Sequence, residues 1–244
     1  MPRAVLKLLL VVAALMLLPS PVVAQEHLSH ALGDVELAPT VTGVLIVAPH
    51  GTFDANTAPL AIQAARRLGA GYVVARQFRV DRIRINVNRP TEGAGLPCAQ
   101  EAHTARAKEV YELWSRAVST AAGGRPLRLY VEVHGNSNPQ AARAVEIASR
   151  GLALADAMRL RDAYPAMLAR ARERVPAYPD IGILLEPLDK VRYTASCSKM
   201  VGTLSTDLVP RALHLEFPRA ARTDATLEAT AMLVADLVRQ LVTE

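Results

Sequence analysis

The chain has 244 residues, 51% of them hydrophobic, and a formal net charge of +5, a length that suits one domain with a single large core. The basic excess consists almost entirely of arginines scattered along the sequence, with no basic cluster interleaved with aromatic residues. This pattern indicates a solvated surface, so we expect no nucleic-acid partner.

The N-terminus has the layout of a secretory signal peptide. Arg3 and Lys7 precede a short apolar stretch, and small residues follow before Gln25. The apolar stretch is shorter than the roughly 20 residues that a membrane span needs, so we expect export to the periplasm or the exterior without a stable membrane anchor. The predicted organisation is a signal peptide over residues 1–24, a polar N-terminal segment over 25–40 and a single domain over 41–244.

Two cysteines, Cys98 and Cys197, lie in segments with the composition of loops. In an exported chain the oxidising environment makes a disulfide the expected state. A bridge would close a loop of roughly 100 residues and stabilise the fold by about 4 kcal/mol. Two free or buried thiols are the alternative.

Short apolar runs that end in Gly, Pro or polar residues alternate with longer runs of helical periodicity. The predicted strands lie in residues 43–51, 71–77, 126–136, 142–149 and 211–218, and the predicted helices in 57–69, 101–124, 156–175 and 224–242, with a polar loop over 86–97. This alternation predicts an α/β fold, a three-layer α/β/α arrangement with a mostly parallel mixed sheet.

Three of these strands end in side chains that suit metal-assisted hydrolysis: His50, His134 and Glu216. In an open parallel sheet, ligands bind beyond the carboxyl ends of the strands. A catalytic zinc takes three protein ligands and keeps one position open, and His50, Asp54 and His134 supply that number if the glycine after His50 lets the chain turn. Glu216 would then be free to take a proton from water activated by Zn²⁺ and return it to the leaving nitrogen.

Each of these residues also has a structural interpretation. A histidine at a strand end is more often a hydrogen-bonded core or surface group than a ligand. Asp54 could cap the following helix, and Glu216 could pair with Arg219 or Arg222.

The loop segment "RINVNRP", residues 84–90, presents Asn88 and Arg89. A guanidinium suits bidentate capture of a carboxylate, so this pair could hold a substrate carboxylate near the scissile amide. Arg84 could stabilise the oxyanion. A salt bridge to Asp81 or Glu92 is the structural alternative for these arginines.

The segments "PHGTFDANT", "VNRP", "VEVHGN" and "LHLEFPR" together resemble the N-formylglutamate amidohydrolase-like zinc hydrolases, relatives of zinc carboxypeptidases, aspartoacylase-type deacylases and phage poly-γ-glutamate hydrolases. The resemblance implies a zinc-carboxypeptidase-like fold and one Zn²⁺ per chain. Carried over by position, it implies His50, Asp54 and His134 as metal ligands, Asn88 and Arg89 as carboxylate readers, and Glu216 as the base. Tyr193 and Lys199, in "VRYTASCSKM", are candidates for binding the acyl group, with solvated loop residues as the alternative.

His214 and Glu132 lie two residues before Glu216 and His134, on the same strand faces. They could orient the metal site, or they could be satisfied core groups. The expected function is hydrolysis of an amide C–N bond in an N-acyl amino acid or peptide-like substrate that bears a carboxylate. The alternatives are a hydrolase of γ-glutamyl or cell-wall peptides, a non-catalytic carboxylate-binding protein, and a fold without a metal.

Overall fold

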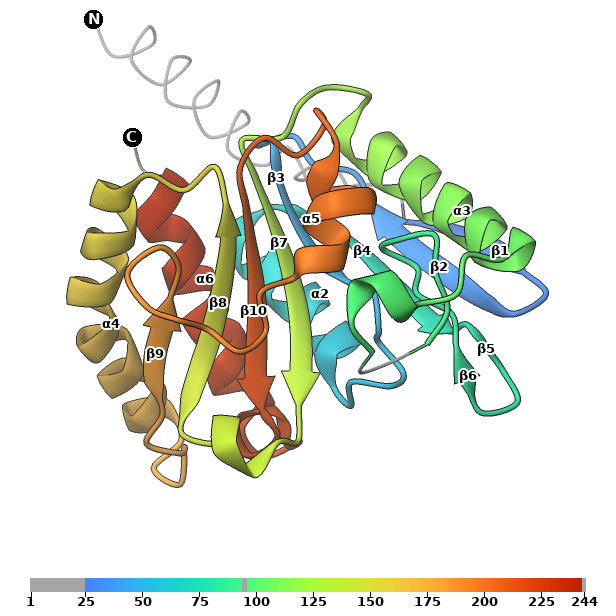
Figure 1. Cartoon of the computed structure of the whole chain (residues 1–244). Helices are drawn as coiled ribbons and strands as arrows, with labels where there is room; N and C mark the ends of the chain where they lie inside the picture. Colours follow the sequence, from blue (N-terminus) through green and yellow to red (C-terminus); the bar gives the residue numbers. More distant parts are fainter. Residues whose placement is uncertain (1–24, 94–95, 243–244) are drawn as a thin grey trace, which may run out of the picture.

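A computed structural model describes residues 25–93 and 96–242, and its framework is an eight-stranded mixed sheet between two helical layers (Figure 1). The predicted signal peptide, residues 1–24, lies outside the described residues. The strands of the sheet are β1 (Glu26–His30), β2 (Gly33–Ala38), β3 (Val44–Ala48), β4 (Gly71–Gln77), β7 (Leu129–Asn136), β8 (Ala144–Arg150), β9 (Gly182–Leu185) and β10 (Ala212–Pro218). The α-helices are α2 (Thr57–Leu68), α3 (Ala105–Ala122), α4 (Leu154–Arg174), α5 (Ser196–Val201) and α6 (Leu227–Val242).

The strands lie in the order β1-β2-β4-β3-β7-β10-β8-β9. The four central strands β4, β3, β7 and β10 are mutually parallel, whereas β2 is antiparallel to β4 and β8 is antiparallel to β10. The carboxyl ends of the central strands therefore meet at one edge of the sheet, and the predicted mostly parallel mixed sheet is confirmed.

Both faces of the central strands are buried, as parallel sheets require. In β3, Val44, Ile46 and Ala48 belong to the core under α2, α4 and α6, while Leu45 and Val47 belong to the core under α3. The helices α4 and α6 lie on the opposite side of the sheet from α3 in Figure 1.

The sheet face on the α3 side carries polar side chains along β7 and β10. Their residues directed to the other face are apolar, whereas Glu132, His134, His214 and Glu216 lie on the α3 side. The long helix α3 packs over β4 and β2 instead, and the short helix α5 and the segment before it lie over this polar region. The sheet face therefore leaves room for a cleft there.

Residues 25–40 differ from the expected polar segment, because they form the hairpin β1–β2 at the edge of the sheet. Val35 and Leu37 are fully buried, and Glu36 between them is bound by the Tyr72 hydroxyl at 2.8 Å and by Arg76 at 2.8 Å. These partners satisfy the hydrogen-bonding capacity of the Glu36 carboxylate, so β2 can be buried although its sequence contains charged residues. The short elements β9 and α5 were also not predicted, and part of the region before the polar loop forms a separate hairpin of β5 (Arg79–Val80) and β6 (Ile83–Arg84).

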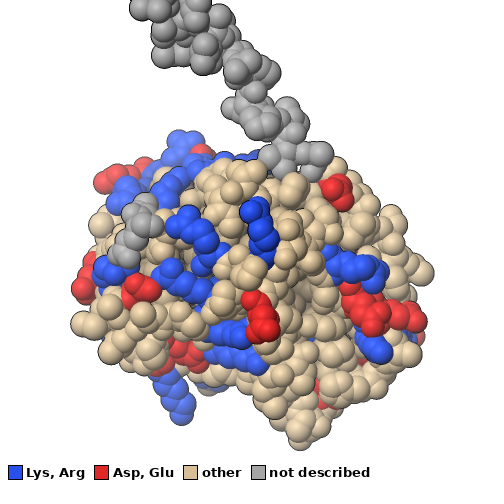
Figure 2. All heavy atoms as spheres, turned by 90° about the horizontal axis from the view of Figure 1, so that it is seen from above, with Lys and Arg blue, Asp and Glu red and all other residues tan. Residues whose placement is uncertain are grey.

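The 3-10 helices are η1 (Cys98–Gln100), η2 (Pro139–Ala141), η3 (Thr203–Ser205) and η4 (Arg219–Arg222). Cys98 and Cys197 form the expected disulfide, which ties η1 to α5. Among residues 25–93 and 96–242, no helix combines the length and the apolar character needed to cross a membrane. Seen from above, acidic side chains are interspersed with basic ones on the surface (Figure 2).

Candidate metal centre

A cavity of about 750 Å³ lies over the carboxyl-terminal parts of β7 and β10 and the loop after β3, and it contains the predicted metal site. Its wall includes His50, Asp54, His134 and Glu216. Its volume lies within the range of about 300–1,000 Å³ typical of small-molecule sites. The sheet thus gathers, at one point, side chains from positions 50 to 216 of the chain.

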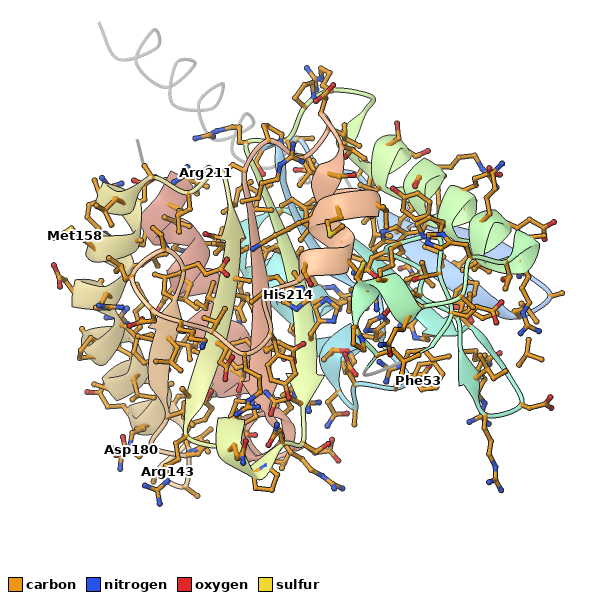
Figure 3. The ribbon with its side chains drawn as sticks, in the orientation of Figure 1. Phe53, Arg143, Met158, Asp180, Arg211 and His214 are labelled. Atoms are coloured by element: carbon orange, nitrogen blue, oxygen red, sulfur yellow. A yellow bond between two sulfur atoms is a disulfide. The ribbon has the colours of Figure 1, made fainter. Side chains whose placement is uncertain are left out.

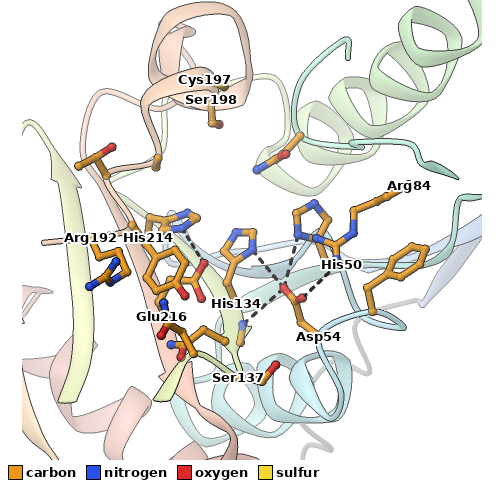
Figure 4. Close-up of a pocket in the computed structure, with 18 of the residues that line it drawn as sticks. His50, Asp54, Arg84, His134, Ser137, Arg192, Cys197, Ser198, His214 and Glu216 are labelled. Carbon is orange, nitrogen blue, oxygen red and sulfur yellow. Dashed lines mark hydrogen bonds and ion pairs between the residues drawn. The ribbon is translucent and has the colours of Figure 1, made fainter. Parts of the chain in front are cut away.

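The three predicted ligands have the spacing of a metal site. Oδ2 of Asp54 lies 3.4 Å from Nδ1 of His50 and 3.5 Å from Nδ1 of His134 (Figure 4). Hydrogen bonds from a ring nitrogen are usually about 2.7–3.2 Å long. Two ligand atoms that each lie about 2.0–2.1 Å from a tetrahedral ion are about 3.3–3.4 Å apart. All three side chains are buried, and the donor set of two imidazoles and one carboxylate fits a catalytic zinc ion.

Asp54 is free for this role because it does not cap helix α2 with its side chain. Asn56 occupies the capping position without a side-chain cap, and Asp54 contributes its main-chain carbonyl to Thr57. The Asp54 carboxylate faces the two histidines and accepts a long contact from the Gly135 N–H at 3.4 Å.

The protonation states at the site follow from burial and from the neighbouring carboxylates. Burial lowers the pKa of His50 to about 4 despite the nearby Asp54, so its ring is neutral at pH 7. Burial alone would raise the pKa of Asp54, but its polar contacts with the imidazoles of His134 and His50 outweigh burial and hold the pKa far below its usual range. Burial opposes the charge on His134 as well, but Asp54 and Glu132 on its two sides raise its pKa to about 10.

A second group of potential ligands, Glu132, His134 and His214, is better described as a hydrogen-bonded network. Oε2 of Glu132 lies 3.2 Å from Nε2 of His134 and 3.0 Å from Nδ1 of His214. These distances are those of hydrogen bonds, and the Tyr130 hydroxyl donates to the same carboxylate at 3.2 Å. Glu132 is fully buried, and it fixes the ring of His134 so that Nδ1 faces Asp54, as an outer partner of a metal-binding histidine does.

Glu216 lies beside the three ligands without being part of them. It is directly opposite His134 in the parallel pair β7–β10, and its Oε1 is 3.4 Å from Nε2 of His214. Its Oε2 is buried without a hydrogen-bond partner among the described residues. Within the same residues, neither Arg219 nor Arg222 forms an ion pair with it, so the expected alternative of a structural salt bridge is not what holds Glu216.

Arg222 joins the segments that carry the site. Its guanidinium donates to the carbonyl oxygens of Phe217 at 3.1 Å and Asn136 at 3.2 Å, and also to that of Ala55. A Cβ atom at Gly135 would overlap this guanidinium. One buried cation therefore connects the ends of β7 and β10 with the loop after His50.

Arg84 lies at the rim of the ligand set. Its Nη2 is 3.7 Å from Oδ1 of Asp54, and its guanidinium stacks over the ring of Phe53 at 4.7 Å. Figure 4 shows it on the side of His50 and Asp54. Arg84 therefore lines the cleft, and its role as an oxyanion-stabilising group stays a prediction.

Asn88 and Arg89 line the cleft, but both are engaged with carboxylates of the protein. Arg89 binds Glu101 in a bidentate fashion, with Nε–Oε2 at 2.7 Å and Nη2–Oε1 at 2.6 Å. The Asn88 amide donates to the Glu132 carboxylate at 3.3 Å. A salt bridge was the expected structural alternative for Arg89, although its partner is Glu101 and not Asp81 or Glu92. Their role in binding substrate stays a prediction.

The two late-loop candidates lie in different places. Tyr193 borders the cavity, and burial together with the charge of Glu216 raises the pKa of its hydroxyl. Lys199 is not among the residues that line the cavity, and its ammonium binds Glu186 at 2.7 Å. The structure therefore does not bring Lys199 to the cleft, because α5 directs it to the segment after β9.

Several polar residues of the cleft were not predicted as site residues, among them Asn136, Arg192 and Arg219. Asn136 is the last residue of "VEVHGN", so its place at a strand end was a usable signal. Arg219 was considered only as a partner of Glu216. Arg192 lies in the segment "VRYTASCSKM", where only Tyr193 and Lys199 were considered, so its position next to Tyr193 was also a usable signal.

Comparison with models of protein families gives no match, and comparison with curated protein sequences gives none. Solved structures are similar at low sequence identity. Gene product Atu2144 from Agrobacterium tumefaciens is 15% identical with a TM-score of 0.50, over 86% of this chain and 94% of that chain. A bacteriophage poly-gamma-glutamate hydrolase is 11% identical with a TM-score of 0.47, over 93% and 94%. A metallo-carboxypeptidase from Burkholderia cenocepacia is 16% identical with a TM-score of 0.43, over 93% and 66%.

The likeness to the Agrobacterium protein shows a shared fold. The other two similarities are weaker, and the more specific resemblance to N-formylglutamate amidohydrolase-like enzymes stays a prediction. The function must be argued from the site itself.

Proposed function

We propose that the chain is an exported zinc-dependent hydrolase that cleaves an amide C–N bond in an N-acyl amino acid or a peptide-like substrate bearing a carboxylate. The observation that carries the proposal is the arrangement of His50, Asp54 and His134 around one point, at distances typical of metal ligands, with Glu216 beside them. The disulfide between Cys98 and Cys197 supports export, because such bonds persist in oxidising compartments.

His50, Asp54 and His134 would hold the ion, and Glu132 would fix the orientation of His134. When bound, Zn²⁺ would act as a Lewis acid toward the amide carbonyl and lower the pKa of water in the site. Glu216 has one oxygen without a partner among the described residues, so it can accept the proton of the attacking water and deliver it to the leaving nitrogen. Arg84 lies where a cation would stabilise negative charge on the carbonyl oxygen.

The alternative substrates are γ-glutamyl or cell-wall peptides. A cavity of about 750 Å³ with an open, polar wall accommodates more than a single acyl amino acid, which favours a peptide-like substrate within the same reaction class. A non-catalytic carboxylate-binding protein would use the same cleft without needing Glu216.

The test is replacement of the base in the full chain. Glu216→Gln is expected to retain zinc, measured by metal analysis, and to lose turnover by two orders of magnitude or more, since general-base catalysis contributes about 10²–10⁴-fold. Amine release is measured with N-acyl amino acids, γ-glutamyl dipeptides and cell-wall peptides. Glu109→Gln, on an exposed position of α3, is the matched control and should leave turnover unchanged.

Two results would contradict the proposal. Full activity of the Glu216→Gln variant would remove Glu216 from the base role. If the zinc-loaded wild type releases amine from none of the substrates, the alternative of a non-catalytic carboxylate-binding protein is favoured. Activity that disappears with a chelator and returns with zinc would exclude that alternative.

A further inference from the structure

Five arginines line the cleft, and three of them are already bound by the protein. Arg89 is neutralised by Glu101, and Arg84 lies against Asp54. Arg222 is buried and donates to three main-chain carbonyl groups. Each of these three guanidinium groups is therefore already engaged with a group of the folded protein.

Arg192 and Arg219 differ, because their charges face the cleft without a carboxylate partner. Both are exposed. Among the described residues, Arg219 has no hydrogen bond or ion pair through its side chain, and Arg192 uses its guanidinium for one bond to the neutral amide of Gln140 at 2.7 Å. The cleft therefore contains two guanidinium groups that form no ion pair within the described residues.

Both arginines lie on the Glu216 side of the metal centre. Arg219 begins η4, three residues after Glu216 on the same chain segment. The backbone N–H groups of Arg192 and Tyr193 donate to Oε2 of Glu146 at 2.5 and 3.2 Å, and Glu146 is opposite Glu216 in the pair β8–β10. Figure 4 shows Arg192 beside His214 and Glu216, with Arg84 on the opposite side near His50.

A third group on this side is also unpaired. Asn136 is 6% exposed and borders the cavity, and neither its amide nitrogen nor its amide oxygen has a hydrogen-bond partner among the described residues. A buried amide without partners is destabilising, so such groups in folded proteins usually meet a ligand or a water molecule. A polar substrate group next to the anion would provide both missing bonds.

We propose that Arg192 and Arg219 form the subsite for the substrate carboxylate, on the Glu216 side of the scissile amide, with Asn136 hydrogen-bonding to the adjoining amide of the substrate. The inference rests on the proposed function. It assigns the carboxylate to these residues in place of Asn88 and Arg89, and it makes the substrate an amide with a free carboxylate on that side.

The experiment measures binding to the zinc-loaded full chain by calorimetry. The probes are N-acetyl-L-glutamate and its neutral diamide, which differ in charge and have nearly the same shape. Arg192→Ala and Arg219→Ala are each expected to weaken binding of the dicarboxylate by about tenfold, the lower end for hydrogen bonds to charged groups. Binding of the diamide should not change, and Arg219→Lys should retain part of the preference for the dicarboxylate.

The matched control is Arg143→Ala, since Arg143 is exposed and lies at the lower edge of the molecule, away from His214 (Figure 3). This variant should bind both probes as the wild type does. Three results would overturn the proposal: no preference of the wild type for the dicarboxylate, binding within twofold of wild type for both alanine variants, or an equal loss for both probes. Because the assay needs no turnover, an inactive protein with this preference would refute only the proposed hydrolysis.

Discussion

The ion pair between Arg89 and Glu101 allows a quantitative prediction, because it is buried and its partners are defined. The Glu101 side chain is 1% exposed and the Arg89 side chain 15%. Thr91 donates a further hydrogen bond to the same carboxylate at 2.5 Å. Glu101→Gln keeps the shape of the side chain and removes its charge, so the guanidinium of Arg89 stays buried without a counter-charge.

Removal of one partner from a buried ion pair typically costs about 3–5 kcal/mol. Glutamine retains an acceptor for one of the two bonds to Arg89, so we expect a loss of about 3 kcal/mol in the free energy of unfolding at pH 7. Burial alone would raise the pKa of Glu101, but the hydrogen bonds and charge of Arg89 lower it below the usual value. The contribution of this ion pair to the free energy of unfolding is therefore fully present above the pKa that Glu101 has in the unfolded chain, and it is lost as the pH falls through the pKa of the folded protein.

The assay is equilibrium unfolding in urea at pH 7 and at two or three lower values. The difference between the wild type and Glu101→Gln should be largest at pH 7 and should narrow in acid. Glu112→Gln is the matched control, because Glu112 is 52% exposed and its contact with Lys108 is 3.9 Å long; exposed pairs contribute about 0–1 kcal/mol. A loss below about 1 kcal/mol for Glu101→Gln, or a difference that does not change with pH, would refute the assignment of a buried, stabilising pair.

Two further predictions concern covalent and alkaline stability. Replacing Cys98 and Cys197 by serine removes a bridge that spans 99 positions and should lower the free energy of unfolding by up to about 4–5 kcal/mol; a urea midpoint equal to that of the oxidised wild type would contradict this. Burial raises the pKa of Tyr178 to about 12 despite its hydrogen bond with Thr230. The contribution of the neutral Tyr178 to the free energy of unfolding is therefore complete below the unfolded pKa of about 10 and is lost as the pH rises toward 12. The midpoint temperature of thermal unfolding should therefore fall less steeply between pH 9 and 12 for Tyr178→Phe than for the wild type. Parallel plots of midpoint temperature against pH would contradict the prediction.

The sequence predicted the centre of the fold well because its strands are long, apolar and bounded by glycine, proline or polar residues. The predicted strands of residues 43–51, 126–136 and 211–218 correspond to β3, β7 and β10. His50, His134 and Glu216 follow from the ends of these strands, since parallel neighbours must finish at one edge of the sheet. The proximity of these three side chains could therefore be inferred without coordinates.

The edges of the sheet could not be predicted in the same way. In β2, Glu36 lies between two buried residues and is satisfied by Tyr72 and Arg76, which are remote in sequence. Strand β9 has four residues, too few for a periodic signal. A short strand at an edge depends on its neighbour for stability, and local composition does not reveal that neighbour.

The arginines of the cleft show a second limit of prediction from the sequence. Sequence patterns indicate that a guanidinium near an asparagine suits a carboxylate, but not whether the protein already supplies one. Arg89 receives Glu101 from a segment twelve residues away, and Lys199 is turned to Glu186. Which cations remain available to a ligand is a property of the tertiary structure.

The hydrogen bonds of Arg222 restrict which residues can occupy neighbouring positions of this site. The same guanidinium holds the chain segments next to Asp54, His134 and Glu216 through hydrogen bonds to their main-chain carbonyl groups. The space for that guanidinium exists only because residue 135 lacks a side chain. A relative with any side chain at the position of Gly135 would therefore need a smaller residue, or a different path of the side chain, at the position of Arg222.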